Sequence, residues 1–145
     1  MRWRLVLGLC YALCGLPSSA AAHHSFAMYD PKQVLTLNGT VKEFQWSNPH
    51  AIVWVLVSRA PDQEPELWTV ELPTSPAGLT RMGWDKHSLN AGDQLILELN
   101  PLREGQHGGS FRKATLTASG KVLTVVSPLS SLAATSTAAV APAAP

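Results

Sequence analysis

Three histidines are the residues of this chain best suited to chemistry. His23 and His24 are adjacent and follow a run of alanines, and His50 closes the motif Trp46-Ser47-Asn48-Pro49-His50. Neutral imidazole is the commonest metal ligand in proteins and binds copper, nickel and zinc well. The histidines therefore indicate a metal site, provided that the fold brings them together.

The N-terminus has the organisation of an export signal. Arg2 and Arg4 precede an apolar run over 5–16, and small residues follow up to Ala22. This is the order of a secretory signal peptide, and the apolar run is too short to span a membrane as a helix. We expect cleavage, with Ala22 as the favoured last residue of the signal, a periplasmic or secreted mature protein, and no membrane span after signal removal.

Cleavage after Ala22 would make His23 the first residue, with an α-amine and an imidazole able to chelate one ion. Their ordinary pKa values, roughly 7.7–8.0 and 6.5, allow both groups to lose their protons near neutral pH. Cleavage one or two residues earlier would make a histidine the third residue of the mature chain. At that position the amine, the backbone amides and the imidazole can bind Cu(II) or Ni(II) in a square-planar arrangement. Copper is the favoured metal, and the alternative is that His23 and His24 form an exposed chain end.

His50 is the natural third ligand, because the Asn48-Pro49 turn would place it at the mouth of a strand, although it could equally be a hydrogen-bonded turn residue. Weaker candidates for ligand binding are Trp46, Asn48, Glu71 and His107. Glu71 could orient a ligand histidine or act as a base, or it could be a solvated strand residue. His107 lies in a glycine-rich loop, which could close over a ligand or could simply connect two strands.

Composition excludes several classes of function. After removal of Arg2 and Arg4, nine basic residues stand against ten acidic ones, so no basic surface for nucleic acid is expected. Both cysteines, Cys10 and Cys14, lie in the signal, so the mature chain has no thiol. Motifs for a nucleophile elbow, a phosphate loop or a zinc protease are missing, which disfavours an enzyme but leaves that class open.

Between the signal and the tail, hydrophobicity alternates with a period of two, as in half-buried strands. The expected strands are 34–46, 51–57, 67–72, 94–99, 111–117 and 121–126. The first should be bulged near Glu43 and Phe44, where its alternation changes register. The strand 51–57 is apolar on both faces, so we expect it to be central and covered on both sides. The four tryptophans of the mature chain are expected to pack in the core rather than form a binding platform.

One short helix is expected between the third and fourth strands. Ser75 suits the N-cap, Pro76 the first helical position and Gly83 the C-terminal end, with Leu79 and Met82 on one face. This order predicts an all-β, OB-like barrel of five to six strands, with a small antiparallel sandwich as the alternative. The predicted organisation is a signal peptide (1–22), a barrel domain (23–126) and a flexible tail (127–145) rich in Ala, Pro, Ser and Thr.

Several motifs together resemble a bacterial family of short exported proteins of unknown function. They are His23-His24-Ser25-Phe26, Tyr29-Asp30, Gly39-Thr40-Val41, Trp46-Ser47-Asn48-Pro49-His50-Ala51, Trp68-Thr69-Val70-Glu71, Gly83-Trp84 and Gly92-Asp93. The resemblance implies a Gram-negative exported protein of one β domain, and it implies no activity, substrate or cofactor.

Two functions remain open from the residues. The first is a periplasmic copper-type module that uses His23, His24 and His50. The second is a metal-free module that binds a peptide, a glycan or a protein through the loops of the barrel. A protein partner or a homodimer is compatible with either function.

Overall fold

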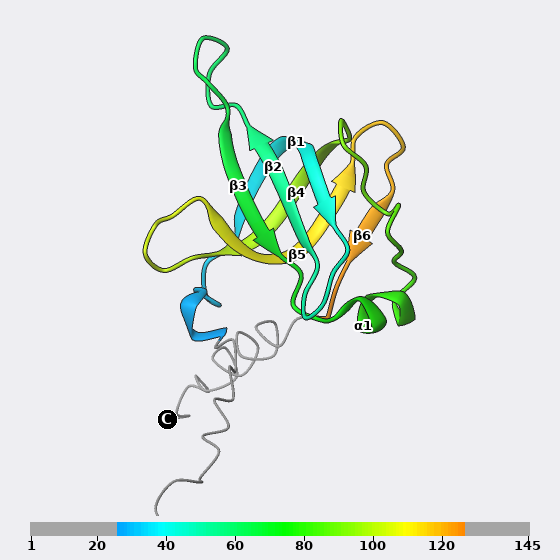
Figure 1. Ribbon diagram of the computed structural model, residues 1–145. Helices are drawn as coiled ribbons and strands as arrows, with labels where there is room; N and C mark the ends of the chain where they lie inside the picture. Colours follow the sequence, from blue (N-terminus) through cyan, green and yellow to red (C-terminus); the bar gives the residue numbers. More distant parts are fainter. Residues whose placement is uncertain (1–25, 127–145) are drawn as a thin grey trace, which may run out of the picture.

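The computed structural model describes residues 26–126, which form an all-β barrel with one short helix (Figure 1). The elements are η1 (Phe26–Met28), β1 (Leu35–Gln45), β2 (Ile52–Val57), β3 (Glu66–Glu71), α1 (Pro76–Arg81), β4 (Gln94–Pro101), β5 (Gly108–Leu116) and β6 (Val122–Thr124). The predicted barrel, with its helix between the third and fourth strands, is confirmed. The expected signal and tail lie outside the described residues.

Five strands close the barrel. They pair in the order β3-β2-β1-β4-β5, and a parallel pairing between β3 and β5 joins the two ends of this order. The remaining neighbours are antiparallel, and β6 adds to β5 as a sixth strand. This pairing order is that of an OB-type barrel rather than of a sandwich.

The long first strand bends so that it can serve two partners. Its first half pairs with β4 and its second half with β2, and the register shifts between Val41 and Glu43. A β-bulge at this point increases the local bend, as the change in alternation predicts. Gly39 lies where the strands approach closely, since a Cβ atom there would meet Val55 Cγ1 at 2.4 Å.

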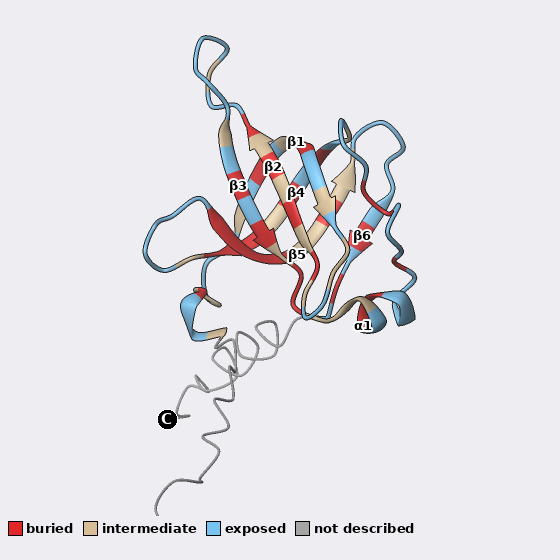
Figure 2. Ribbon diagram, viewed as in Figure 1, coloured by how far each residue is buried: buried red, intermediate tan, exposed pale blue. Residues whose placement is uncertain are grey.

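The core fills the barrel interior. Buried and more exposed residues alternate along the strands (Figure 2), and Val53, Val55 and Val57 of β2 all point inward. Phe111 from β5 is among the largest fully buried side chains. Complete burial of such an apolar side chain contributes about 1.5–3 kcal/mol, so these inward positions carry most of the stabilisation.

The outward face of β2 differs from the expectation. Ile52, Trp54 and Leu56 are only half-buried, and α1 lies at one end of the barrel rather than over this strand (Figure 2). A barrel has its single core inside, so neighbouring strands shield an outward side chain only at its edges. The prediction that the strand is covered on both sides is therefore wrong within residues 26–126. Trp54 accordingly lies outside the core, whereas Trp68 is buried in it.

The helix α1 follows the predicted capping pattern. The side chain of Ser75 accepts a hydrogen bond from the Gly78 N–H at 3.3 Å, and Gly83 has a φ of +86° just after the helix. Leu79 is buried, whereas Met82, three residues later, is the C-cap and 41% exposed. Within residues 26–126, no helix is long and apolar enough to cross a membrane.

The strand β5 begins earlier than the sequence predicts. Residues 108–110 were expected in a loop, but they form the parallel pairing with β3 that closes the barrel. Gly109 fits this position because a Cβ atom there would lie 2.5 Å from the Asn100 carbonyl oxygen. Local composition favours a loop, and the backbone partner supplied by β3 overrides that preference.

Candidate functional site

His50 lies at the point where the chain enters β2. It follows the cis peptide bond between Asn48 and Pro49 and precedes the fully buried Ala51. The pairing of Ile52 with Glu71 sets the last residue of β3 opposite the first residue of β2. Since side chains two residues apart along an extended segment point to the same side, this register carries the Glu71 carboxylate towards His50.

The Glu71 carboxylate bridges two side chains. Its Oε1 pairs with Nδ1 of His50, and its Oε2 accepts a hydrogen bond of 2.7 Å from the Tyr29 hydroxyl. Both oxygens of one carboxylate are therefore engaged by groups from different parts of the chain. We call Tyr29, His50 and Glu71 the carboxylate-bridged group.

This group defines the state of the His50 ring. An ionised carboxylate only accepts hydrogen bonds, so the Nδ1 atom that faces Glu71 carries the proton in a neutral imidazole. In this tautomer the lone pair lies on Nε2, which is the atom that would bind a metal ion. The side chains of His50 and Glu71 are 21% and 26% exposed, so the group lies in a partly shielded position.

Tyr29 is the buried member of the group. Burial raises the pKa of its phenol well above the ordinary value of 10.0, and the hydrogen bond to Glu71 and the charge of this carboxylate raise it further. The phenol therefore keeps its proton at neutral pH and acts as a donor to Glu71. Its 5% exposure leaves the ring almost without contact with water.

The segment that carries Tyr29 is attached to the barrel at several points. The buried Asn100 amide donates to the carbonyl oxygens of Asp30 and Gln33 at 3.2 and 2.8 Å. Arg103 donates from its backbone N–H and its Nε to two carbonyls of η1, at 3.0 and 2.9 Å. Residues 26–33 are thus held against the end of β4, next to the carboxylate-bridged group.

The structure brings together two of the predicted site residues, His50 and Glu71. The alternative of a solvated strand residue is therefore wrong for Glu71, whose two oxygens are both engaged. Asp30, next to Tyr29, forms a turn in which its Oδ1 accepts a hydrogen bond from the Lys32 N–H at 3.0 Å. His23 and His24 lie outside the described residues.

The other candidates have different surroundings. Asn48 is exposed, and Trp46 is half-buried and packs edge-on against Phe44 with a centroid distance of 5.8 Å. His107 stacks on the Trp68 indole at 5.1 Å, and its Nε2 lies 3.6 Å from a Glu66 oxygen. It is therefore engaged with a group of residues separate from the carboxylate-bridged group.

Tyr29 is the member of the candidate site that the sequence analysis did not identify. It appeared only as part of the Tyr29-Asp30 motif, and an aromatic residue before a turn usually indicates packing. The available signal was its position as the only tyrosine after the predicted signal, since the chain's other tyrosine is Tyr11. Its role depends on a contact with a residue 42 positions away, which local patterns do not encode.

Metal binding would require ligands beyond those the structure describes. Among residues 26–126, no group of three or more His, Cys, Asp or Glu side chains is arranged to hold a metal ion. His50 presents the partner arrangement typical of a ligand histidine, with one ring nitrogen held by a carboxylate that is itself held by a phenol. A complete site built on His50 therefore needs donors from another segment.

Comparison with known protein families identifies the family to which the barrel is similar. A family model described as "Family of unknown function (DUF6152)" matches residues 12–124, which include nearly the whole barrel. No curated protein matches the chain.

Proposed function

The chain belongs to the DUF6152 family of unknown function, and we propose that it is a metal-binding module for a copper-type ion. In this proposal His50 shares one ion with the histidines at the processed N-terminus, His23 and His24. The observation that carries the proposal is the Glu71 carboxylate, which holds Nδ1 of His50 on one side and the Tyr29 phenol on the other.

The bridged carboxylate supports the role of His50. Histidines that bind metals usually donate their second ring N–H to a carboxylate or a carbonyl, which fixes the tautomer and raises the basicity of the ligating nitrogen. Glu71 has this relation to His50, and Tyr29 in turn fixes Glu71. A histidine that only packs in a turn does not need a carboxylate partner that is itself held by a second side chain.

The anchored N-terminal segment supports the role of the two terminal histidines. His24 precedes Phe26 by two residues, so their Cα atoms are at most about 7 Å apart. Phe26 is held one turn from Tyr29, whose N–H donates to the Phe26 carbonyl at 3.1 Å. Because Tyr29 contacts Glu71, a short tether of this kind would give His24 a high effective concentration near His50 in the proposed site.

The choice of copper rests on the donors. Cleavage after Ala22 would add an α-amine to imidazole nitrogens, and a set of nitrogen donors without a thiolate suits Cu(II). The predicted export signal would send the module to the periplasm or outside the cell, and the handling or sensing of copper there is the role we propose.

The test is a Cu(II) titration of residues 23–145 with a free N-terminus, followed by visible absorption and calorimetry. We expect one tightly bound ion in the wild type and a loss of affinity in His50→Ala and in His23→Ala/His24→Ala. Glu71→Gln should weaken binding about 10- to 100-fold, as removal of such an orienting partner typically does. His87→Ala is the matched control, because His87 is an exposed histidine that is not a member of the carboxylate-bridged group.

The outcomes separate three cases. Weaker binding in both the His50 and the terminal variants supports a site that joins the N-terminus to the barrel. A loss confined to the terminal variants would reduce the site to a peptide chelate and refute the role of His50. Absence of tight binding in the wild type would refute the metal function and favour the alternative, a module that binds a peptide, a glycan or a protein.

A further inference from the structure

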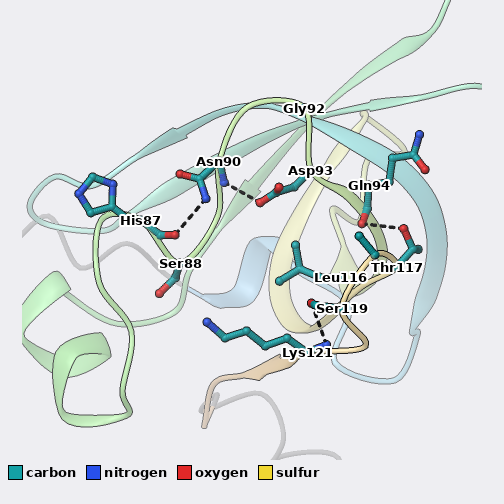
Figure 3. A pocket seen from close by; sticks show the side chains of 11 residues that line it. His87, Ser88, Asn90, Gly92, Asp93, Gln94, Leu116, Thr117, Ser119 and Lys121 are labelled. Atoms are coloured by element: carbon teal, nitrogen blue, oxygen red, sulfur yellow. Dashed lines mark hydrogen bonds between the residues drawn. The ribbon is translucent and has the colours of Figure 1, made fainter.

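A cavity lies between residues 87–94 and the turn 117–121 that joins β5 to β6 (Figure 3). Its volume is about 510 Å³, within the range of sites that bind small molecules. None of the residues that line it belongs to the carboxylate-bridged group. The cavity is therefore a separate candidate site.

Hydrogen bonds hold the walls of the cavity in place. Thr117 donates from its N–H and its hydroxyl to the Gln94 carbonyl, at 2.9 and 3.1 Å. These bonds join the two walls, and within the wall 87–94 Asp93 Oδ2 accepts a hydrogen bond of 2.8 Å from the Asn90 N–H. Both walls are formed by hydrogen-bonded turns, so a ligand would enter a largely preformed cavity.

The cavity carries opposite charges on its two sides. The side chains of Asp93 and Lys121 approach from different walls, and the apolar side chain of Leu116 lies between them (Figure 3). Lys121 makes no ion pair with any carboxylate of residues 26–126. Its ammonium group can therefore bind a ligand without first breaking an ion pair.

We propose that this cavity binds a short peptide with free ends, whose carboxylate pairs with Lys121 and whose ammonium group pairs with Asp93. A simple anion would meet the Asp93 carboxylate, and a simple cation would meet the Lys121 ammonium, so a ligand with both charges fits best. Sugars commonly stack on an aromatic face, and no Trp, Tyr or Phe lines the cavity. The side-chain nitrogen of Asn90 donates to the His87 carbonyl at 3.1 Å, which leaves the amide oxygen as a partner for a peptide N–H.

The experiment uses dialanine as the probe and follows backbone amide shifts by NMR in the presence of a chelator, so that metal binding has no influence. Dialanine should produce saturable shifts at residues 87–94 and 116–121. N-acetyl-dialanine, which lacks the ammonium group, and dialanine amide, which lacks the carboxylate, should both bind more weakly. Removal of one exposed charge pair is expected to weaken binding about two- to fivefold.

Two variants assign each end of the ligand. Lys121→Met should lower the affinity for dialanine but not for dialanine amide, because the amide has no carboxylate to pair with Lys121. Asp93→Asn retains a side-chain oxygen for the Asn90 N–H and should lower the affinity for dialanine but not for the acetylated peptide. Lys32→Met is the control, because Lys32 is an exposed lysine that does not line the cavity.

The results would decide the proposal. Saturable shifts at the cavity with the predicted dependence on both charged ends support it. Equal shifts with the capped peptides, or an unchanged affinity of Lys121→Met for dialanine, would overturn it. The absence of saturable shifts at the cavity would also overturn it. Because the metal function does not involve these residues, none of these outcomes bears on copper binding.

Discussion

Replacement of Tyr29 by phenylalanine tests whether the carboxylate-bridged group stabilises the barrel. The substitution keeps the buried ring and removes only the hydroxyl that donates to Glu71 at 2.7 Å. The packing of the ring should therefore change little, and the measured effect should report the lost hydrogen bond.

The size of the effect follows from the two partners. A hydrogen bond to a charged group contributes about 1.5–3 kcal/mol when the charge is well shielded. The Glu71 side chain is 26% exposed, so water can replace part of the lost interaction. We therefore expect Tyr29→Phe to lower the free energy of unfolding by about 1–2 kcal/mol.

Equilibrium unfolding in urea of residues 23–145 measures this change, and a double-mutant cycle with Glu71→Gln isolates the pair. In the Glu71→Gln background, Tyr29→Phe should cost less than in the wild type, since the charged acceptor is already gone. A cost in the wild type below about 0.5 kcal/mol, within the range of ordinary surface substitutions, would refute the reasoning. Equal costs in both backgrounds would refute it as well.

Three further predictions concern titration and packing. The pKa of the Tyr29 phenol is raised in the folded state, so the stabilising effect of the phenol should be complete below about pH 10 and should decline as the pH rises further. In an absorbance titration, the phenolate should appear only at a higher pH than in free tyrosine. Hydrogen bonds from the Trp68 indole and the Arg59 guanidinium lower the pKa of the partly exposed Glu66, so its contribution should be present above about pH 4.3 and be lost in acid, and urea unfolding of Glu66→Gln should show a weaker dependence on acid pH. Phe111→Ala should cost about 3–5 kcal/mol in thermal or urea unfolding, because the ring is fully buried in the core, and a cost below about 1 kcal/mol would contradict this packing.

Local patterns predicted most of the fold. The strand alternation, the Ser75 cap and the Gly83 terminator all act over a few residues, and the structure confirms them. The errors occur where distant segments meet. Residues 108–110 are a strand because β3 lies beside them, and the outward side chains of β2 are half-exposed because the barrel has only an inner core.

The candidate site likewise combines residues that the sequence identified with contacts between distant segments that it did not predict. The sequence identified His50 and Glu71 separately, and it suggested that Glu71 could orient a ligand histidine. Their contact depends on the register of β2 with β3, which places Ile52 opposite Glu71. Tyr29 joins them from a segment that is bound to β4, so no short stretch of sequence contains the whole group.

The parallel seam between β3 and β5 has a consequence for the order of folding. Glu71 lies in this seam, opposite Ser110, and the seam joins residues about forty positions apart in the chain. Contacts with such long sequence separation form slowly, because a long loop must be closed before they are made. Hairpins such as β2 with β3 can form early, but the last residue of β3 becomes fully fixed only when β5 arrives. A partly folded chain would therefore lack the oriented His50 ring, and an ion that requires it would be captured only by a finished barrel.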